Sequence, residues 1–245
     1  MEERTNALLL KYPGTNCDFE TARALEAAGF STQILPIARF TEESLRSIQL
    51  VVLSGGFSYG DYVMAGRLAQ LETERRVGDA LTSFRDSGGY LMGICNGFQI
   101  LTKLGLLPEG SLIDNVSGRF ICKWVQLNKN TDSSPFLKGL PESFELPIAH
   151  AEGRFVAPSG LAESYLEDGL AALLYKDDIN GSSCQIAGLT DETGRVFGLM
   201  PHPERFLLES HHYDSDWKRD DNGWGTGYFI FKSIFNEISE EVSNQ

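Results

Sequence analysis

The 245-residue chain lacks the features that mark membrane, secreted and disulfide-bonded proteins. No apolar run approaches the roughly 18 residues that a transmembrane helix needs. The opening stretch MEERTNALLLKY has no basic start, and its apolar core is too short for a signal peptide. Cysteines are few, they form no CxxC pair, and a chain of this size needs no disulfide bonds. We therefore expect a cytoplasmic protein with free thiols and no membrane partner.

Positive charge is also scarce. The chain has 21 Lys and Arg against 34 Asp and Glu, which gives a net charge of −13. Such an acidic protein repels phosphate backbones, so nucleic acid is not an expected partner. Internal repeats, low-complexity tracts and linkers rich in Pro, Gly or Ser are absent from the sequence. Together with the length, this predicts one domain over residues 1–245.

The first half of the chain alternates between strand-like and helix-like stretches. Short apolar runs predict strands at 7–12, 31–37, 49–56 and 90–95. Helical spacing predicts helices at 19–30, 42–48, 72–89 and 96–105; Gly29 is expected to end the first and Thr41 to cap the second. This alternation predicts a parallel sheet with helices on both faces.

The second half predicts further strands at 119–127, 144–150 and 154–158, and a hairpin over 185–200 that turns at Asp191–Gly194. Aromatic and aliphatic residues at helical spacing predict a core-packed helix over 228–238. The polar stretch 211–227 is expected to be a surface loop. The predicted fold class is therefore α/β: a single-domain, three-layer structure with a mixed, mainly parallel sheet.

One motif, Gly93-Ile94-Cys95-Asn96-Gly97, has the form G-x-nucleophile-x-G at a strand-to-helix junction. A nucleophile on so sharp a turn has strained dihedral angles, and glycines two residues away on either side avoid collisions. The thiol would then stand at the carboxyl edge of the sheet and at the positive end of a helix, which favours the thiolate. The alternative is a small buried Cys at a tight turn. The other cysteines, Cys17, Cys122 and Cys184, are interpreted as structural, with Cys17 adjacent to the same edge.

A catalytic Cys95 would need a base, and His202 in GLMPHPERF has the best setting. The flanking prolines hold this segment extended, so that Glu204 can lie beside the imidazole and fix its tautomer. The alternative is a surface His between two prolines. His150 could substitute as the base, but together with Glu152 it is interpreted as a candidate for contact with the substrate.

Donors for an oxyanion could come from the backbone N–H of Asn96 and from the glycine loop at Gly55 and Gly56. That loop could instead cradle a phosphate, but no GK[ST] follows it. His211 and His212 have no third ligand at a suitable spacing, so no metal site is predicted.

These residues together resemble the class I glutamine amidotransferases, whose Cys-His-Glu triad matches Cys95, His202 and Glu204. Among these enzymes, the chain is similar to the glutaminase subunits of phosphoribosylformylglycinamidine synthase, of purine biosynthesis. The motifs that carry the resemblance follow one another along the chain: PGTNCD (13–18), GGFSYGDY (55–62), GICNGFQIL (93–101), AHAEGRF (149–155), INGS with IAG (179–188) and MPHPER (200–205). Two positions depart from the pattern: Ser54 stands in place of Pro and Ala151 in place of Gly.

The resemblance implies a glutaminase that hydrolyses L-glutamine and passes ammonia to a separate ATP-dependent synthetase, with a small accessory subunit. It also implies that Gln99, one turn after Cys95, contacts the bound glutamine. No cofactor is expected in this chain, since the family places ATP and Mg²⁺ in the synthetase. Three alternatives remain: a glutaminase serving another synthetase, a cysteine hydrolase on the same fold, and a non-catalytic subunit.

Overall fold

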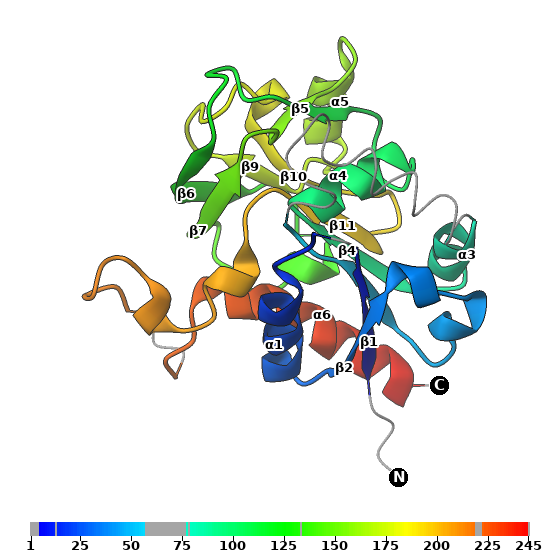
Figure 1. Cartoon of the computed structure of the whole chain (residues 1–245). Coiled ribbons are helices and arrows are strands. Elements are labelled where there is room, and N and C mark those ends of the chain that lie inside the picture. The colour runs from blue at the N-terminus through cyan, green and yellow to red at the C-terminus, as the bar shows by residue number, and fades with distance from the viewer. Residues whose placement is uncertain are drawn as a thin grey trace.

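The computed structural model describes residues 5–12, 14–56, 77, 79–132, 134–218 and 222–244. Within these ranges the centre of the molecule is a nine-stranded sheet (Figure 1), whose spatial order is β2 (Ser31–Pro36), β1 (Asn6–Lys11), β3 (Leu50–Leu53), β4 (Tyr90–Ile94), β11 (Val196–Leu199), β10 (Ile186–Thr190), β9 (Leu173–Tyr175), β6 (Ile121–Lys129) and β7 (Ser143–His150). Neighbouring strands pair in parallel from β2 to β11 and antiparallel from β11 to β7. A separate antiparallel pair joins β5 (Ser111–Ile113) to β8 (Arg154–Val156).

Helices cover both faces of this sheet. The α-helices in the described part of the chain are α1 (Asp18–Ala28), α3 (Ala80–Asp86), α4 (Asn96–Lys103), α5 (Leu161–Glu167) and α6 (Thr226–Ser243). On β11, Phe197 stacks on Phe136, beside α6, whereas a Cβ on the next residue, Gly198, would touch Phe98 of α4. Adjacent strand residues point to opposite faces, so α6 and α4 lie on opposite sides of the sheet. Helix α1 packs beside α6 (Figure 1). The predicted three-layer α/β fold is confirmed.

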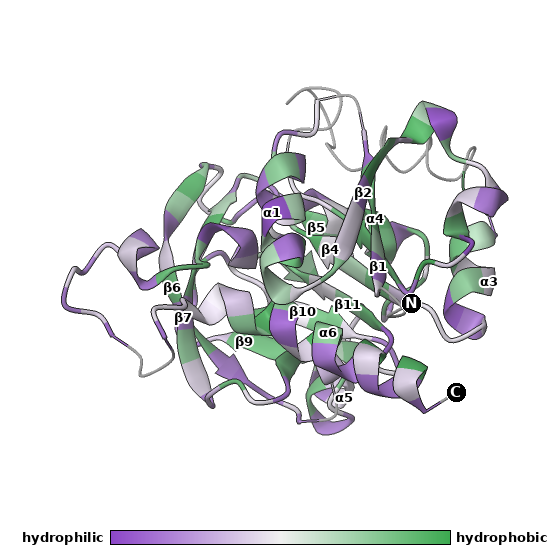
Figure 2. Cartoon of the chain, turned by 90° about the horizontal axis from the view of Figure 1, so that it is seen from below, coloured by the Kyte–Doolittle hydropathy of each residue, from purple (hydrophilic) through white to green (hydrophobic). Residues whose placement is uncertain are grey.

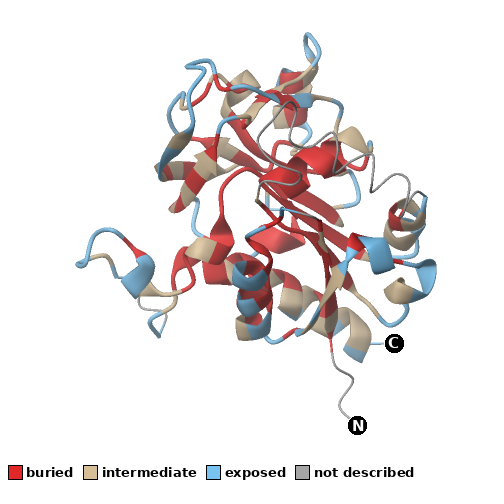
Figure 3. Ribbon diagram, in the orientation of Figure 1, coloured by how far each residue is buried: buried red, intermediate tan, exposed pale blue. Residues whose placement is uncertain are grey.

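The apolar strand runs form the core. Strands β3, β4, β10 and β11 are buried along their whole length, and the buried apolar residues belong to one cluster. Figure 3 shows this burial concentrated on the central strands, and Figure 2 shows α1 and α6 alternating between apolar and polar residues. Helix α6 runs longer than predicted, and five of its apolar residues are buried: Tyr228, Ile230, Phe231, Ile234 and Ile238. None of the helices in the described ranges is long and apolar enough to cross a membrane.

Local signals placed several element ends correctly. Helix α1 ends at Gly29, whose left-handed backbone (φ 119°) lets it donate to Leu25 and Glu26. The predicted hairpin forms from β10 and β11. Thr41 caps the segment that follows it, but that segment is a 3₁₀ helix over Glu42–Leu45 and not the predicted α-helix. Of the helix predicted over 72–89, only α3 falls in the described residues, because 72–76 and 78 lie outside them.

The prediction of a polar surface loop over 211–227 is wrong in part. His212 is buried, its Nε2 lies 2.8 Å from Oε2 of Glu145, and its ring packs 4.8 Å from Trp124. Trp217 packs on Phe206 in the same cluster. Although most residues of this stretch are polar, its aromatic side chains pack against the sheet, because burying their large apolar area is more favourable than exposing it to water. The segment therefore covers the outer part of the antiparallel half of the sheet.

Candidate active site

Four parallel strands deliver the candidate residues to one edge of the sheet. Cys17 follows β1, Gly55 follows β3, Cys95 follows β4 and His202 follows β11. These strands are adjacent and point the same way, so their carboxyl ends lie together. This edge is where open α/β sheets bind their ligands.

Cys95 occupies the strained turn that its motif predicts. Its backbone angles are φ 53° and ψ −106°, in a region that residues with a Cβ rarely adopt. The turn is held from both sides, because Cys95 N–H donates to Leu199 of β11 and Cys95 C=O accepts from Gln99 N–H. The thiol therefore stands at the start of α4, at the positive end of the helix dipole.

The two flanking glycines are required by close packing. A Cβ on Gly93 would lie 2.6 Å from the carbonyl of Gly97, and one on Gly97 would lie 1.9 Å from the carbonyl oxygen of Leu53. No side chain fits at either separation. The two glycines of the G-x-C-x-G motif are therefore needed because α4 packs so closely against β3 and β4.

His202 and Glu204 form a buried pair, with 2.7 Å between Nδ1 and Oε1. The preceding segment is anchored by His202 N–H, which donates to Pro147 of β7. Burial lowers the pKa of His202, but the carboxylate of Glu204 and the sulfur of Cys95 outweigh it, and the net pKa lies well above its usual value. The raised pKa favours the protonated imidazolium, whose positive charge faces the sulfur of Cys95.

Gly55 brings the imidazole and the thiol side by side. A Cβ at this position would lie 2.9 Å from Cε1 of His202 and 3.3 Å from Cβ of Cys95. Gly56 has φ 127°, and a Cβ there would lie 2.7 Å from the backbone nitrogen of Asn16. The remainder of the GGFSYGDY motif, from residue 57 on, lies outside the described residues.

A pocket of about 280 Å³ opens beside Cys95, and its walls include Asn96, Gln99, His150 and Glu152. This volume is close to the ~300 Å³ at which small-molecule sites begin, and it suits a ligand the size of an amino acid. Gln99 is held in place, because its Nε2 donates to the backbone carbonyl of Glu152 at 2.6 Å. The structure therefore brings the predicted substrate-contact residues, Cys95 and His202 into one pocket, and Glu204 lies behind the imidazole and does not line the pocket.

Asn115, which no sequence motif singled out, fixes the state of His150. Its Nδ2 donates to the carbonyls of Arg119 and His150, so its Oδ1 faces Nδ1 of His150, 3.1 Å away, as an acceptor. Nδ1 of His150 must then carry the hydrogen, and Nε2 presents a lone pair. Burial and the nearby His202 lower the pKa of His150 to about 4, so the ring is neutral at pH 7. Among the described residues, Nε2 has no hydrogen-bond partner.

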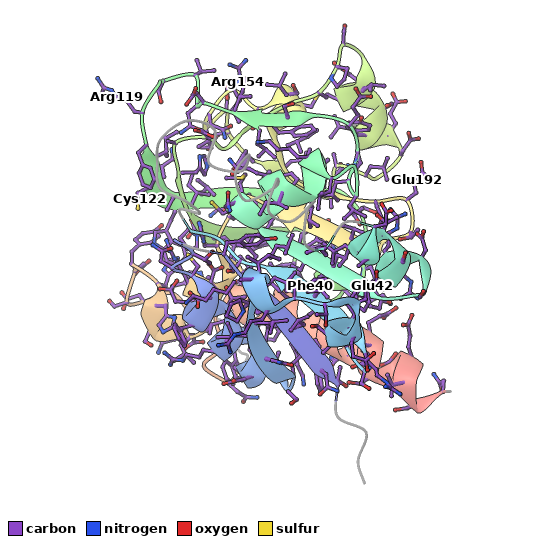
Figure 4. All side chains as sticks on the ribbon, turned by 45° about the vertical axis from the view of Figure 1, so that its right-hand side comes forward. Phe40, Glu42, Arg119, Cys122, Arg154 and Glu192 are labelled. Carbon is purple, nitrogen blue, oxygen red and sulfur yellow. The ribbon has the colours of Figure 1, made fainter. Side chains whose placement is uncertain are left out.

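Two cysteine interpretations need correction. Cys122 is exposed and lines the pocket, so it is not a buried structural residue; Figure 4 shows it at the edge of the molecule. Cys17 is 1% exposed and lies against the site, where Arg205 donates to its sulfur at 3.2 Å. The MPHPER motif contains Arg205, but no local signal connects it with a residue 188 positions earlier. All four cysteines are free, as predicted.

Comparisons with known proteins agree with this geometry. Residues 4–236 match the family of CobB/CobQ-like glutamine amidotransferase domains. The chain is 41% identical over 237 residues to phosphoribosylformylglycinamidine synthase subunit PurQ of Thermotoga maritima, covering 96% of this chain and 99% of the relative. PurQ of Thermus thermophilus is 42% identical over 210 residues, covering 82% of this chain and 89% of the relative. The chain belongs to the PurQ family.

Solved structures extend the likeness to the fold. A chain in the structure of PurLQS from Thermotoga maritima superposes with a TM-score of 0.80 at 37% identity, covering 96% of this chain and 99% of that one. A glutamine amidotransferase from the same organism has a TM-score of 0.62 at 16% identity, covers 97% of this chain and 99% of its own, and shares the fold. The family resemblance drawn from the motifs is thereby confirmed, and this member of the PurQ family is a glutamine amidotransferase.

Proposed function

We propose that the chain is the glutaminase subunit of a phosphoribosylformylglycinamidine synthase, and that Cys95, His202 and Glu204 carry its chemistry. It hydrolyses L-glutamine to glutamate and releases ammonia for amidine formation. The observation that carries the assignment of residues is the strained Cys95 turn beside a buried His–Glu pair, in a chain of the PurQ family.

The reaction follows from the charges at the site. The Cys95 thiolate attacks the side-chain carbonyl carbon of glutamine, and the oxygen becomes an oxyanion that accepts hydrogen bonds from backbone N–H groups, for which we assign Asn96 and the Gly55–Gly56 turn. The His202 imidazolium gives its proton to the departing nitrogen, and ammonia and a thioester result. His202, now neutral, takes a proton from water, which cleaves the thioester to glutamate and restores the thiolate.

The pocket walls supply the contacts with the rest of the substrate. The lone pair on Nε2 of His150 is suited to accept a hydrogen bond from the α-ammonium group of glutamine, and a neutral ring does not repel that cation. Gln99 stands one helical turn after the nucleophile on α4 and donates to the backbone carbonyl of Glu152, which follows β7. We assign all three to substrate binding.

The ammonia acceptor belongs to a separate chain. We propose that a large ATP-dependent synthetase, with a small accessory subunit, receives the ammonia and converts formylglycinamide ribonucleotide to the amidine. The likeness to a chain of PurLQS supports these partners. ATP and Mg²⁺ are assigned to the synthetase and no cofactor to this chain. Glutaminases of other synthetases and cysteine hydrolases of the same fold are less well supported, because the named relatives are PurQ subunits.

The decisive experiment replaces the nucleophile. Cys95→Ser should lower glutamine-dependent amidine formation at least ~10³-fold, because a serine hydroxyl is not ionised by this imidazole. The same assembled complex should still form product from added ammonia. Cys184→Ser, which changes a half-buried thiol that does not line the pocket, is the matched control. Glutamine turnover near the wild-type rate in the Cys95→Ser complex would refute the assignment.

A further inference from the structure

The active site contains a second cysteine that the proposed reaction does not use. In the described part of the chain, the one set of three potential metal ligands is Cys17, His202 and Glu204. One ligand atom from each residue lies within 4.8 Å of the other two. All three residues are at least nine-tenths buried, unlike the exposed acidic clusters that are common on protein surfaces.

Two atoms of this set have unused bonding capacity. Within the described ranges, Nε2 of His202 and Oε2 of Glu204 are buried and have no hydrogen-bond partner. Leaving a buried polar atom without a partner is destabilising, so each of the two atoms is an open position for a ligand. The sulfur of Cys17 completes the set, and Arg205 donates to it at 3.2 Å.

We propose that Cys17, His202 and Glu204 bind a thiophilic divalent cation, Zn²⁺ or its analogue Cd²⁺, and that the bound cation inhibits glutamine hydrolysis. Thiolate, imidazole and carboxylate are ligands that Zn²⁺ prefers. A thiolate and a carboxylate balance the charge of the cation, which a buried site requires, and the cation displaces the proton from Nε2 of His202 as it binds. Tetrahedral Zn²⁺ sets its ligand atoms roughly 3.3–3.8 Å apart, so the present separations need to close by little more than about 1 Å.

Inhibition follows from which groups the cation would occupy. A metal on His202 takes the lone pair that accepts the proton of water, and a metal on Glu204 removes the carboxylate that orients the ring. Cys17 and His202 line the same pocket as Cys95, so the bound cation would lie at the wall that carries the nucleophile. Mg²⁺ prefers oxygen ligands in an octahedral arrangement and does not fit this set, so the cation needed by the synthetase would not inhibit the glutaminase. The inhibitory consequence rests on the proposed function, whereas the binding itself does not.

Binding can be measured on the full chain without glutamine. Zn²⁺ competition against a fluorescent chelator should give one site per chain in the wild type, and Cd²⁺ should give a thiolate charge-transfer band in the ultraviolet. The Cys17→Ser variant should raise the Kd for Zn²⁺ at least tenfold and lose the band. The Cys95→Ala variant, inactive under the proposed mechanism, should keep both, and so should Cys122→Ser, the matched control for a pocket thiol. A hundredfold excess of Mg²⁺ should leave the Kd unchanged.

The opposite pattern would overturn the proposal. If Cys95→Ala abolished binding and Cys17→Ser did not, the cation would be bound by the nucleophile. If Mg²⁺ displaced Zn²⁺, the ligands would not include the thiolate of Cys17. If Cys17→Ser fails to fold, anomalous scattering from Cd²⁺ in wild-type crystals decides the matter, with the metal expected on Cys17 Sγ. Glutamine turnover should fall on adding Zn²⁺ and recover with a chelator, in proportion to occupancy of that site. Failure of the Cys95→Ser test with intact metal binding would refute the proposed function alone.

Discussion

At the scale of single residues, the site depends on backbone positions that leave each side chain little freedom. Cys95 is held in a left-handed turn, and the two prolines beside His202 restrict the segment that carries the imidazole. Glu204 is two residues away and reaches Nδ1 because the chain turns there into the 3₁₀ helix Pro203–Arg205. The predicted pair therefore forms, but the predicted extended conformation of this segment is wrong from Pro203 on. Sequence spacing predicted this pair and placed Cys17 at the same edge of the sheet, but it did not predict that Cys17 lies against His202.

The His–Glu pair can be tested through Glu204→Gln. The amide cannot supply the charge that raises the pKa of His202 against the effect of burial, so less of the imidazolium forms at neutral pH. We expect kcat to fall about 10²–10⁴-fold with little change in KM, and the descending limb of the pH profile to move to lower pH. Steady-state kinetics between pH 5 and 9 provide the measurement.

Glu20→Gln is the matched control, because Glu20 pairs with Arg205 at the rim without touching the imidazole. It removes one carboxylate from the same neighbourhood and should leave kcat within about twofold. A Glu204→Gln variant in which only KM rises would mean that Glu204 contacts the substrate and does not orient His202.

At the scale of elements, the elbow is the junction of β4 with α4, and the two glycines allow α4 to lie directly on β3. The residues at positions two before and two after Cys95 touch backbone, so the motif reflects packing as much as chemistry. Sequence reasoning found this element from its pattern alone. It misjudged Glu42–Leu45, because a capping box fixes where a helix begins and says nothing about how many turns follow.

Gly97→Ala tests that packing. Alanine raises helix propensity inside α4, yet its Cβ would lie 1.9 Å from the carbonyl oxygen of Leu53, so α4 has to move away from β3. We expect a loss of about 3 kcal/mol or more in the free energy of unfolding and a loss of glutaminase activity. Denaturant unfolding and turnover are measured on the same sample.

The control substitution is Gly105→Ala, at a position with φ 70° and no atom within 4 Å of the added Cβ among the described residues. Here only backbone strain acts, and the expected cost is about 1 kcal/mol with activity kept. Equal effects of the two substitutions would show that the closeness of α4 to β3 does not explain the motif.

At the scale of the whole molecule, the pocket lies between the carboxyl ends of the parallel strands and the pair formed by β6 and β7. The parallel strands deliver Cys95 and His202, while β7, at the far edge, delivers His150 and the turn that contains Glu152. The ring of His150 is buried and neutral, and a Cβ on Gly153 would fall within 2.4 Å of it. The protonation of this one side chain therefore affects the stability of the entire fold.

The pH dependence of stability should reveal His150. Its pKa is about 4 in the folded protein and ~6.5 in the unfolded chain, so between these values the unfolded state binds more protons. Stability therefore falls as the pH drops from about 6.5 to about 4, by up to about 3 kcal/mol from this group. His202, with its raised pKa, has the opposite dependence, and its contribution is lost as the pH rises through its folded pKa.

Comparing the wild type with a His150 variant isolates the contribution of His150. The stability difference between wild type and His150→Gln, measured by denaturant unfolding at pH 7, 5.5 and 4, should shrink or reverse toward low pH. His211→Gln removes an exposed imidazole and should give a much smaller pH dependence. A His150→Gln difference that stays constant with pH would contradict a buried, neutral His150.

The sequence by itself determined the strand–helix alternation, the elbow around Cys95, the His202–Glu204 pair and the family, because these depend on residues close together in the chain. Only the tertiary structure decided that β11 lies parallel beside β4, with Val196 opposite Leu91, although about a hundred residues separate them. That pairing brings His202 to Cys95. It also decided that Asn115 orients His150 and that Cys17 lies against His202. Such contacts depend on the order of the strands in the sheet, and the spacing of residues within one short segment does not determine that order.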